Sequence, residues 1–272
     1  MKKAKQGAVP VPKKNLWKQI AKHWEFYVLL LPGIILTIIF KYVPMYGVQI
    51  AFRDYNPVGG FFGSPWVGLK WFERFFNNYN SMRMIKNTVV LSLYSILWTF
   101  PIPIILALLI NQVKWKKFQR VSQTILYAPH FISTMILCGM LRIFLSPYGG
   151  LISTIIQAFG GKATNLIDSA TAFRTIYISS SVWQDAGWGT IIYIATLSSV
   201  DASLHEAARV DGATPLQRIF YIDIPELIPV IVIQLIMSFG NLMNVGFEKA
   251  YLLQTSLNKA TSEIIATYVY EQ

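Results

Sequence analysis

Long apolar runs separated by short polar connectors dominate the sequence. Five runs approach the ~20 residues that a helix needs to cross a ~30 Å hydrocarbon core, and they lie at roughly 26–52, 87–111, 122–145, 173–200 and 227–247. A membrane β-barrel would instead show alternating segments of about 10 residues, whereas these runs are continuous. The pattern therefore predicts an all-α fold, a polytopic bundle of membrane helices within residues 26–272.

The first run is the least regular. Lys41 and Pro44 interrupt it, and its purest part, residues 28–39, is no longer than the apolar core of a signal peptide. No small-residue cleavage site follows it. We therefore interpret it as a retained span whose Lys41 extends its ammonium group toward the lipid headgroups.

Basic residues in the flanks predict the orientation, because an excess of lysine and arginine marks the cytoplasmic side of a membrane protein. The tail, residues 1–25, carries Lys2, Lys3, Lys5, Lys13, Lys14, Lys18 and Lys22. After two spans, the connector 112–121 carries Lys114, Lys116, Lys117 and Arg120. We therefore expect a multi-pass protein of the bacterial cytoplasmic membrane, with the N-terminal tail and the connector 201–226 in the cytoplasm.

Composition agrees with a membrane protein. Hydrophobic residues make up 54% of the chain and charged residues only 14%, and the mean hydropathy is +0.44. The formal net charge of +11 could indicate nucleic acid, but much of it lies in the two cytoplasmic flanks. Anionic lipid headgroups account for such charge, so we expect contact with membrane lipid and no nucleic-acid binding.

The number of runs is odd. Five spans from a cytoplasmic start would leave residues 248–272 outside the cell without a final anchor. The ending 264–272 stops abruptly, so we expect a sixth helix to be missing from the chain.

The connector 201–226 is the most structured polar segment. Asp201 or Ser203 offers an N-cap for a helix over 204–210, and Gly212 permits the chain reversal that ends it. Pro215 suits the first turn of a second helix over 216–224. The sequence predicts helix, turn, helix, although spacing alone is equally compatible with an ordinary charged loop between spans.

Few residues could support enzyme chemistry or a metal. Cys138 is the lone cysteine and lies in an apolar run, and the three histidines, His23, His130 and His205, fall in a tail, a span and a connector. Metalloprotease and serine-hydrolase motifs are absent. A phosphate-loop motif is absent too, because Gly161-Lys162 lacks the flanking residues that such a loop requires. We expect no catalytic residue, no metal site and no ATP-binding site in this chain.

Three features of the connector carry a resemblance. Glu206-Ala207-Ala208, Gly212 six residues after the glutamate, and Ile222-Asp223-Ile224-Pro225 resemble the EAA loop of binding-protein-dependent ABC importer permeases, with Ile224 in place of the usual leucine. Further tracts resemble the carbohydrate-uptake branch, most closely its polysaccharide or aldouronate-type permeases. These tracts are 63–69, Ala128-Pro129 and 183–189.

The resemblance implies a MetI-like fold, usually with six helices, and an importer without an ATPase site of its own. A short helix containing Glu206, Ala207, Ala208 and Asp211 would dock on a dimer of cytoplasmic ABC ATPases, which bind the ATP. Glu206 would accept a charge-assisted hydrogen bond from the ATPase, and the small side chains, including Ala213, would permit close approach. Gly212 would keep the turn undistorted.

The resemblance also implies a carbohydrate substrate, an oligosaccharide that could contain uronic acids, and two further protein partners. These are a second, different permease and an extracellular solute-binding lipoprotein. The connectors 53–86 and 146–172, rich in Gly, Pro and aromatic residues, are predicted to meet the binding protein. The alternative interpretation is that these two connectors only cap the helical bundle.

Polar groups at membrane depth are the candidates for the substrate path, since such groups usually face a protein interior or a water-filled cavity. They are Gln184, Asp185, Gln234, Asn241 and Asn244, with Trp183 and Trp188 able to stack on sugar rings. The same residue types also bond between helices or sit at the membrane interface. Arg142 fits a snorkelling or ion-pairing role better than binding of an acidic sugar.

Two other classes stay open: a non-transporting membrane structural subunit and a membrane-embedded enzyme. An enzyme would require convergent catalytic groups at depth, and Asp185 with scattered histidines offers little of that kind.

Overall fold

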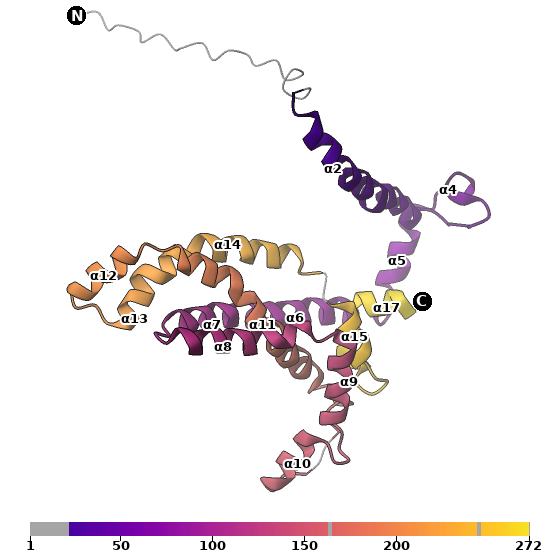
Figure 1. The fold of residues 1–272 in the computed structure, drawn as a ribbon. Helices are drawn as coiled ribbons and strands as arrows, with labels where there is room; N and C mark the ends of the chain where they lie inside the picture. The colour runs from indigo at the N-terminus through magenta and orange to yellow at the C-terminus, as the bar shows by residue number, and fades with distance from the viewer. Residues whose placement is uncertain (1–21, 163–164, 244–245, 272) are drawn as a thin grey trace, which may run out of the picture. The chain divides into compact units, whose positions relative to one another are not determined.

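The computed structural model describes residues 22–162, 165–243 and 246–271, and every regular element in these ranges is helical. The predicted all-α fold is therefore confirmed (Figure 1). Most of the basic tail, residues 1–21, lies outside the described ranges. The chain divides into two compact units, Met1–Asn77 and Asn78–Gln272.

One apolar helix dominates the first unit. Its consecutive elements are α2 (Trp24–Thr37), η1 (Ile38–Tyr42), α3 (Val43–Met45) and η2 (Tyr46–Phe52). Together they form a helix of 29 residues that is long and apolar enough to cross a membrane, and it coincides with the first predicted span. Element η1 is a π-helical turn directly before Pro44. A proline ring lacks an N–H donor and crowds the preceding turn, which a wider turn relieves.

The loop after this helix is ordered around Arg53. The Arg53 guanidinium donates to the carbonyl oxygens of Phe61 at 2.8 Å and Ser64 at 2.9 Å. It also lies over the ring of Trp66, which stacks on Phe52 with 5.4 Å between ring centroids. Two short helices complete the unit, α4 (Gly60–Gly63) and α5 (Lys70–Phe76). Hydrogen bonds and ring contacts therefore give this loop a defined conformation.

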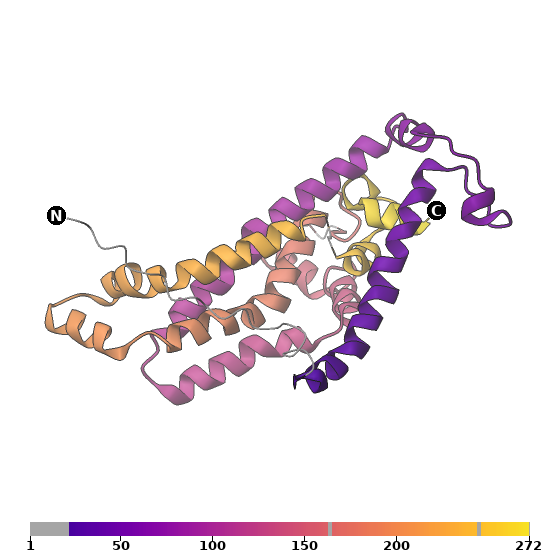
Figure 2. The same cartoon turned by 90° about the horizontal axis from the view of Figure 1, so that it is seen from above.

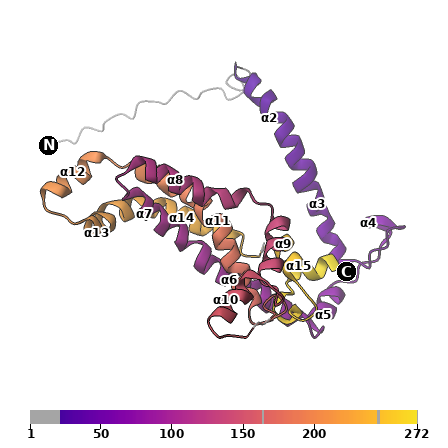
Figure 3. The same cartoon turned by 60° about the horizontal axis from the view of Figure 1, so that its bottom comes forward.

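The second unit is a helical bundle. Its elements in chain order are α6 (Ser81–Thr99), α7 (Pro101–Asn111), α8 (Lys116–Tyr127), η3 (Ala128–Phe131), α9 (Thr134–Phe144), α10 (Leu151–Ala158), α11 (Phe173–Ser198), α12 (Ala202–Val210), α13 (Pro215–Arg218), η4 (Ile219–Asp223), α14 (Ile224–Gly240), α15 (Phe247–Leu253), α16 (Lys259–Ser262) and α17 (Ile265–Glu271). Figures 1, 2 and 3 show α12 and α13 at one end of this bundle and the C-terminal elements at the other.

Helix α11 lies at the centre of the bundle, against α6, α7, α8, α14 and α15. It coincides with the predicted span 173–200 but is not among the described helices that qualify as spans by length and apolarity. Its buried residues include Ser180, Gln184 and Thr190. A helix enclosed by other helices meets protein rather than lipid, so it tolerates polar side chains.

Close packing on α11 depends on Gly187. A Cβ atom there would lie 1.9 Å from the carbonyl oxygen of Leu126 on α8. No real side chain fits at that distance, so the backbones of α8 and α11 touch because residue 187 is glycine.

The predicted third span, 122–145, contains a sharp bend. The segments Lys116–Phe131 and Thr134–Phe144 meet at an angle of 95°. Pro129 sits in the 3-10 turn η3, and Ser133 caps the next helix by accepting a hydrogen bond from the Ile136 N–H. The chain therefore contains a helix stop and a new helix start inside one apolar run.

The helix that overlaps the predicted fifth span, 227–247, has different bounds. The structure instead has one helical segment, Pro215–Gly240, that qualifies as a span by length and apolarity. It begins earlier because π-helical η4 carries the helix through Pro225, which lacks a donor for the carbonyl oxygen of the preceding turn. It ends earlier because Gly240 and Asn241 favour helix termination.

Candidate functional site

The α12–α13 hairpin, residues 201–226, begins with a capped helix. The Oδ1 atom of Asp201 accepts a hydrogen bond from the Ser203 backbone N–H at 2.9 Å. The N-cap is therefore Asp201, one of the two predicted residues. This backbone hydrogen bond is the main cause of a lowered pKa of the Asp201 carboxyl group, and a hydrogen bond from the Ser203 side chain adds to it. Both bonds favour the charged form of the carboxyl group.

Gly212 ends α12 by reversing the chain. Its φ angle is +79°, and within the described ranges only glycines have positive φ. The Gly212 N–H donates to the Arg209 carbonyl at 3.1 Å, and the Ala213 N–H donates to the Ala208 carbonyl at 2.8 Å. These two bonds form a Schellman motif, which confirms the predicted turn at Gly212.

The second half of the hairpin begins with a capping box that the sequence analysis missed. The Thr214 hydroxyl accepts a hydrogen bond from the Gln217 backbone N–H, and the Gln217 side-chain oxygen accepts from the Thr214 backbone N–H at 2.7 Å. The spacing Thr-Pro-x-Gln was a usable signal for it. The predicted second helix over 216–224 was wrong at its end, because α13, η4 and α14 continue without interruption to Gly240.

The hairpin presents acidic and apolar side chains to its surroundings. Of the residues predicted to dock a partner, the exposed ones are Glu206, Ala207, Asp211 and Gly212, and the half-buried ones are Ala208 and Ala213. Among the described residues, no side chain forms an ion pair with Glu206. Val210 is 88% and Tyr221 is 81% exposed. Exposed apolar side chains beside an unpaired carboxylate are typical of a protein interaction surface.

A buried carboxylate ties the hairpin to the bundle. Asp223 is fully buried, accepts a hydrogen bond from the Gln112 side-chain amide at 3.0 Å, and lies 3.3 Å from Nε2 of His205. Gln112 follows α7, and His205 belongs to α12. No local sequence pattern indicates this tether, which links the end of α7, α12 and η4 through one side chain.

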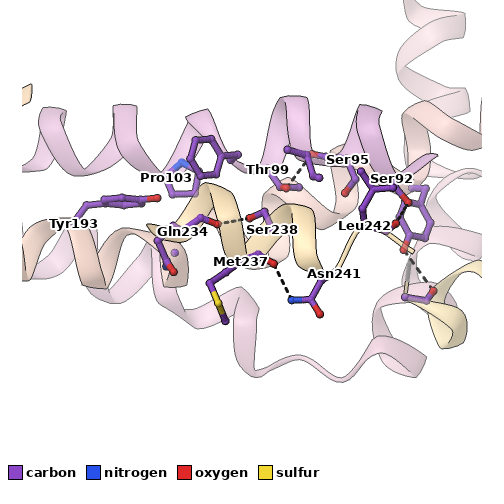
Figure 4. A pocket seen from close by; sticks show the side chains of 15 residues that line it. Ser92, Ser95, Thr99, Pro103, Tyr193, Gln234, Met237, Ser238, Asn241 and Leu242 are labelled. Carbon is purple, nitrogen blue, oxygen red and sulfur yellow. Dashed lines mark hydrogen bonds between the residues drawn. The ribbon is translucent and has the colours of Figure 1, made fainter. Parts of the chain in front are cut away.

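A cavity of about 410 Å³ lies between α6, α7, α11 and α14. Figure 4 shows Ser92, Ser95 and Thr99 on one side of it and Gln234, Ser238 and Asn241 on the other. Tyr193 also lines it, and the Ser92 hydroxyl donates to the Leu242 carbonyl. Hydroxyls, amides and a phenol ring suit a hydroxylated ligand. The structure thus brings Gln234 and Asn241 together, while Asn244 lies outside the described residues.

The other predicted path residues do not line this cavity. Gln184 is buried and donates to the Ile132 carbonyl at 2.8 Å, where it holds the bend between η3 and α9. Asp185 lies 2.9 Å from Nδ1 of His130, whose ring stacks on Trp188 at 4.4 Å between centroids. Asp185, Trp188 and Trp183 are exposed. His130, treated as isolated in the sequence, therefore belongs to a cluster on the surface of the bundle.

Cationic side chains gather at the end of the bundle away from the hairpin. Arg142 donates to the Leu252 carbonyl at 2.6 Å and lines a cavity of about 630 Å³. Lys249 is buried, donates to the Ser181 hydroxyl at 2.9 Å, and lies over the Tyr177 ring. Neither forms an ion pair with a described residue. Arg142 therefore offers positive charge to a ligand in that cavity, whereas Lys249 lines neither that cavity nor the one between α6, α7, α11 and α14.

A family model described as the binding-protein-dependent transport system inner membrane component matches residues 77–272. The chain belongs to that family. This confirms the resemblance carried by the hairpin motif, and it favours a permease over a membrane enzyme or a structural subunit. The hairpin, the cavity and the bend all lie within the matched residues.

Curated relatives extend the likeness to almost the whole permease. It is 42% identical over 258 residues to the polygalacturonan/rhamnogalacturonan transport system permease protein YteP of Bacillus subtilis, covering 95% of this chain and 80% of that one. It is 41% identical to Protein LplB of Bacillus subtilis, covering 90% of this chain and 77% of that one.

Solved structures give the same result. The permease superposes with a TM-score of 0.86 and 40% identity on a chain of a bacterial ABC transporter involved in the import of the acidic polysaccharide alginate, covering 95% of this chain and 87% of that chain. A second match, with a TM-score of 0.85, 40% identity and coverage of 95% and 86%, is to the bacterial alginate ABC transporter in complex with an alginate pentasaccharide-bound periplasmic protein.

Proposed function

We propose that this permease is the transmembrane subunit of an ABC importer that translocates an acidic oligosaccharide. Support comes from relatives named for polygalacturonan, rhamnogalacturonan and alginate. One structural observation carries the proposal: the helix that leaves the hairpin at Pro215 is the helix that brings Gln234 and Asn241 into the cavity.

The continuous helix supplies a mechanical connection. A partner ATPase would bind the exposed face of α12, with Glu206 accepting a charge-assisted hydrogen bond from a basic residue. The Asp223 tether would pass movement of α12 to η4 and α14. Movement of α14 would then change the cavity walls, as expected for alternating access. ATP binding and hydrolysis belong to the ATPase dimer, and this chain requires no cofactor of its own.

The substrate class follows from the cavity and from Arg142. Gln234, Asn241 and Tyr193 offer amide and phenol groups for sugar hydroxyls. Arg142, which lines the cavity of about 630 Å³, offers positive charge for carboxylates such as those of uronic acids. A neutral saccharide would use the amide and phenol groups and leave Arg142 without an anionic partner.

The remaining assembly follows the orientation inferred from the basic flanks. The N-terminus and the hairpin would lie in the cytoplasm. A solute-binding lipoprotein would meet the opposite side through connectors such as the ordered loop around Arg53. A second, different permease would cover the exposed cluster of Trp183, Asp185 and Trp188, so that these residues face a path shared by the two subunits.

The test is uptake by proteoliposomes that contain this permease, its partner permease, the ATPase and the binding protein. An oligogalacturonate should be imported with ATP, and a neutral oligosaccharide of equal length should be imported poorly. Glu206→Ala should lower uptake and ATPase association about tenfold or more, the size expected for loss of one charge-assisted bond at an interface.

Glu248→Ala is the matched control, since this exposed glutamate lies at the opposite end of the bundle. It should leave ATPase association unchanged. Unchanged uptake and association in Glu206→Ala would disprove the docking role. Absence of uptake with every combination of partners would disprove translocation.

A further inference from the structure

A second cavity lies beside the hairpin, away from the predicted substrate path. Its volume is about 330 Å³, and it is enclosed by the turn between α7 and α8, the end of α11, and the hairpin. The charged and titratable residues that line it are Lys114, Lys116, His205, Glu206, Arg209 and Arg218. The proposed function assigns Glu206 to the ATPase and no small ligand to this space.

The cavity is strongly basic. Four cations, Lys114, Lys116, Arg209 and Arg218, face a single lining carboxylate, that of Glu206. Within the described part of the chain none of the four forms an ion pair. The neighbouring Asp223 accepts a hydrogen bond from Gln112 and lies beside His205, and its charge also acts on Arg218, so it offsets part of this positive charge.

The side chain of Arg218 favours an anion in this cavity. Its Nε atom is buried and has no hydrogen-bond partner among the described residues. A buried guanidinium donor without an acceptor is costly. A phosphate oxygen in the cavity would satisfy this donor and balance the surrounding charge.

The position of the cavity favours a lipid over a soluble anion. Asn111, in its wall, ends the apolar helix Ser81–Asn111. Directly after it, Trp115 and Phe118 are 67% and 53% exposed and stack with 6.4 Å between ring centroids. Aromatic side chains at the end of a membrane helix mark the headgroup level.

An apolar stripe continues from these rings along α8. Val121 is 56% and Ile125 is 65% exposed, at helical spacing from Phe118. The stripe can lie along acyl chains while Lys114 and Lys116, beside Trp115, stay at the polar boundary. The geometry therefore places a basic cavity next to a surface suited to lipid tails.

We propose that this cavity binds the headgroup phosphate of an anionic phospholipid. The phosphate lies between the cations of the α7–α8 turn and Arg209 and Arg218 of the hairpin, while the acyl chains follow the stripe on α8. The lipid thus joins the hairpin to the turn at a second point, in addition to the Asp223 tether. Anionic lipid becomes a structural requirement for the orientation of α12.

The experiment is native mass spectrometry of the purified, assembled transporter titrated with phosphatidylglycerol or phosphatidylcholine. The double variant Arg209→Gln and Arg218→Gln should weaken phosphatidylglycerol binding about 25-fold, since each basic residue contributes about fivefold. Arg209→Lys with Arg218→Lys should retain most of the binding. Lys114→Gln with Lys116→Gln provides an independent variant outside the hairpin.

Lys117→Gln with Arg120→Gln is the matched control. Lys117 and Arg120 are exposed residues in the first half of α8. Together they carry the same charge as Arg209 and Arg218, but they do not line the cavity. The control should leave the tightest phosphatidylglycerol site intact. Equal weakening in the control and the Arg209/Arg218 variant would show diffuse surface attraction and overturn the proposal.

Two further arms distinguish the sources of the anion. Inorganic phosphate and glycerol phosphate should compete poorly, and competition at equal affinity would overturn a lipid in favour of a soluble anion. Addition of the ATPase should leave the bound lipid in place, and its displacement by the ATPase would assign the cavity to an acidic residue of that partner. These readouts are independent of sugar uptake, so the proposal and the importer function can fail separately.

Discussion

The Nε2 atom of His205 lies 3.3 Å from Oδ1 of Asp223, which joins α12 to a fully buried carboxylate at the start of the helix that lines the central cavity. Asp223→Ala should remove this contact and leave the Gln112 amide without its acceptor. We expect a loss of about 2 to 4 kcal/mol in the free energy of unfolding. Thermal unfolding of the purified transporter would measure it.

The same substitution should uncouple the ATPase from transport. Once α12 is released, ATP hydrolysis should persist while uptake falls. Asp223→Asn is the comparison, because it keeps an acceptor for Gln112 and removes the negative charge beside His205. Equal uptake per ATP hydrolysed in wild type and Asp223→Ala would contradict a role of the tether in coupling.

Gly212→Ala should distort the hairpin turn. An alanine at φ +79° is strained by about 1 to 2 kcal/mol, and relief of that strain would break the bonds from Gly212 and Ala213 to α12. We expect weaker ATPase binding with little change in sugar binding at the opposite end. Gly212→Asn should be milder, because asparagine tolerates this conformation. Titration of the ATPase on reconstituted variants gives the ranking, and a reversed order would exclude the turn as the cause.

The Asp201 N-cap should weaken in acid. Its folded pKa is lowered by the bonds from Ser203, so its contribution is present above the unfolded value of about 3.9 and is lost as pH falls through the lower, folded value. Amide hydrogen exchange in α12, corrected for intrinsic pH dependence, should therefore accelerate below about pH 4. Asp201→Asn keeps an acceptor that does not titrate. A pH response of the same size in Asp201→Asn would assign the effect to another group.

Local features of the hairpin could be predicted from sequence, and its long-range contacts could not. Asp201, Gly212 and Pro215 act on residues within a few positions, so their types alone indicate cap, turn and helix start. The hydrogen bonds between Gln112 and Asp223 and between His130 and Asp185 join positions 111 and 55 residues apart. They depend on how the end of α7 packs against η4 and how η3 packs against α11, which no local pattern encodes.

The bend inside the third apolar run was missed for a related reason. Hydrophobicity marks which residues avoid water, and the third run is apolar on both sides of its bend. Pro129 and Ser133 carried the correct local signal, but a single apolar run masked it. The cavity escaped prediction in part because Ser92, Ser95 and Thr99 are small polar residues inside an apolar helix, where they commonly bond to their own backbone.

Gly187→Ala should damage the contact between α8 and α11. The added Cβ would lie 1.9 Å from the Leu126 carbonyl oxygen, so the two backbones must separate. Overpacking of this kind costs about 1 to 3 kcal/mol, and the unfolding temperature in detergent should fall. Gly139→Ala, on α9, has nothing within 4 Å of its added Cβ and should be neutral. Similar unfolding temperatures for the two variants would show that α8 and α11 are not in close contact.

Alanine substitutions of Gln184 and Gln234 should have different effects, because one side-chain amide supports the fold and the other lines the cavity. Gln184 is buried and donates to the Ile132 carbonyl at the bend. Gln184→Ala leaves that oxygen unpaired, so the free energy of unfolding should fall by about 1 to 3 kcal/mol. Gln234 lines the cavity, and its side-chain amide has no hydrogen bond to a described residue. Gln234→Ala should therefore leave stability unchanged and raise the oligosaccharide concentration for half-maximal uptake severalfold. Unfolding curves and uptake kinetics on both variants give the comparison, and a stability loss confined to Gln234→Ala would reverse the two roles.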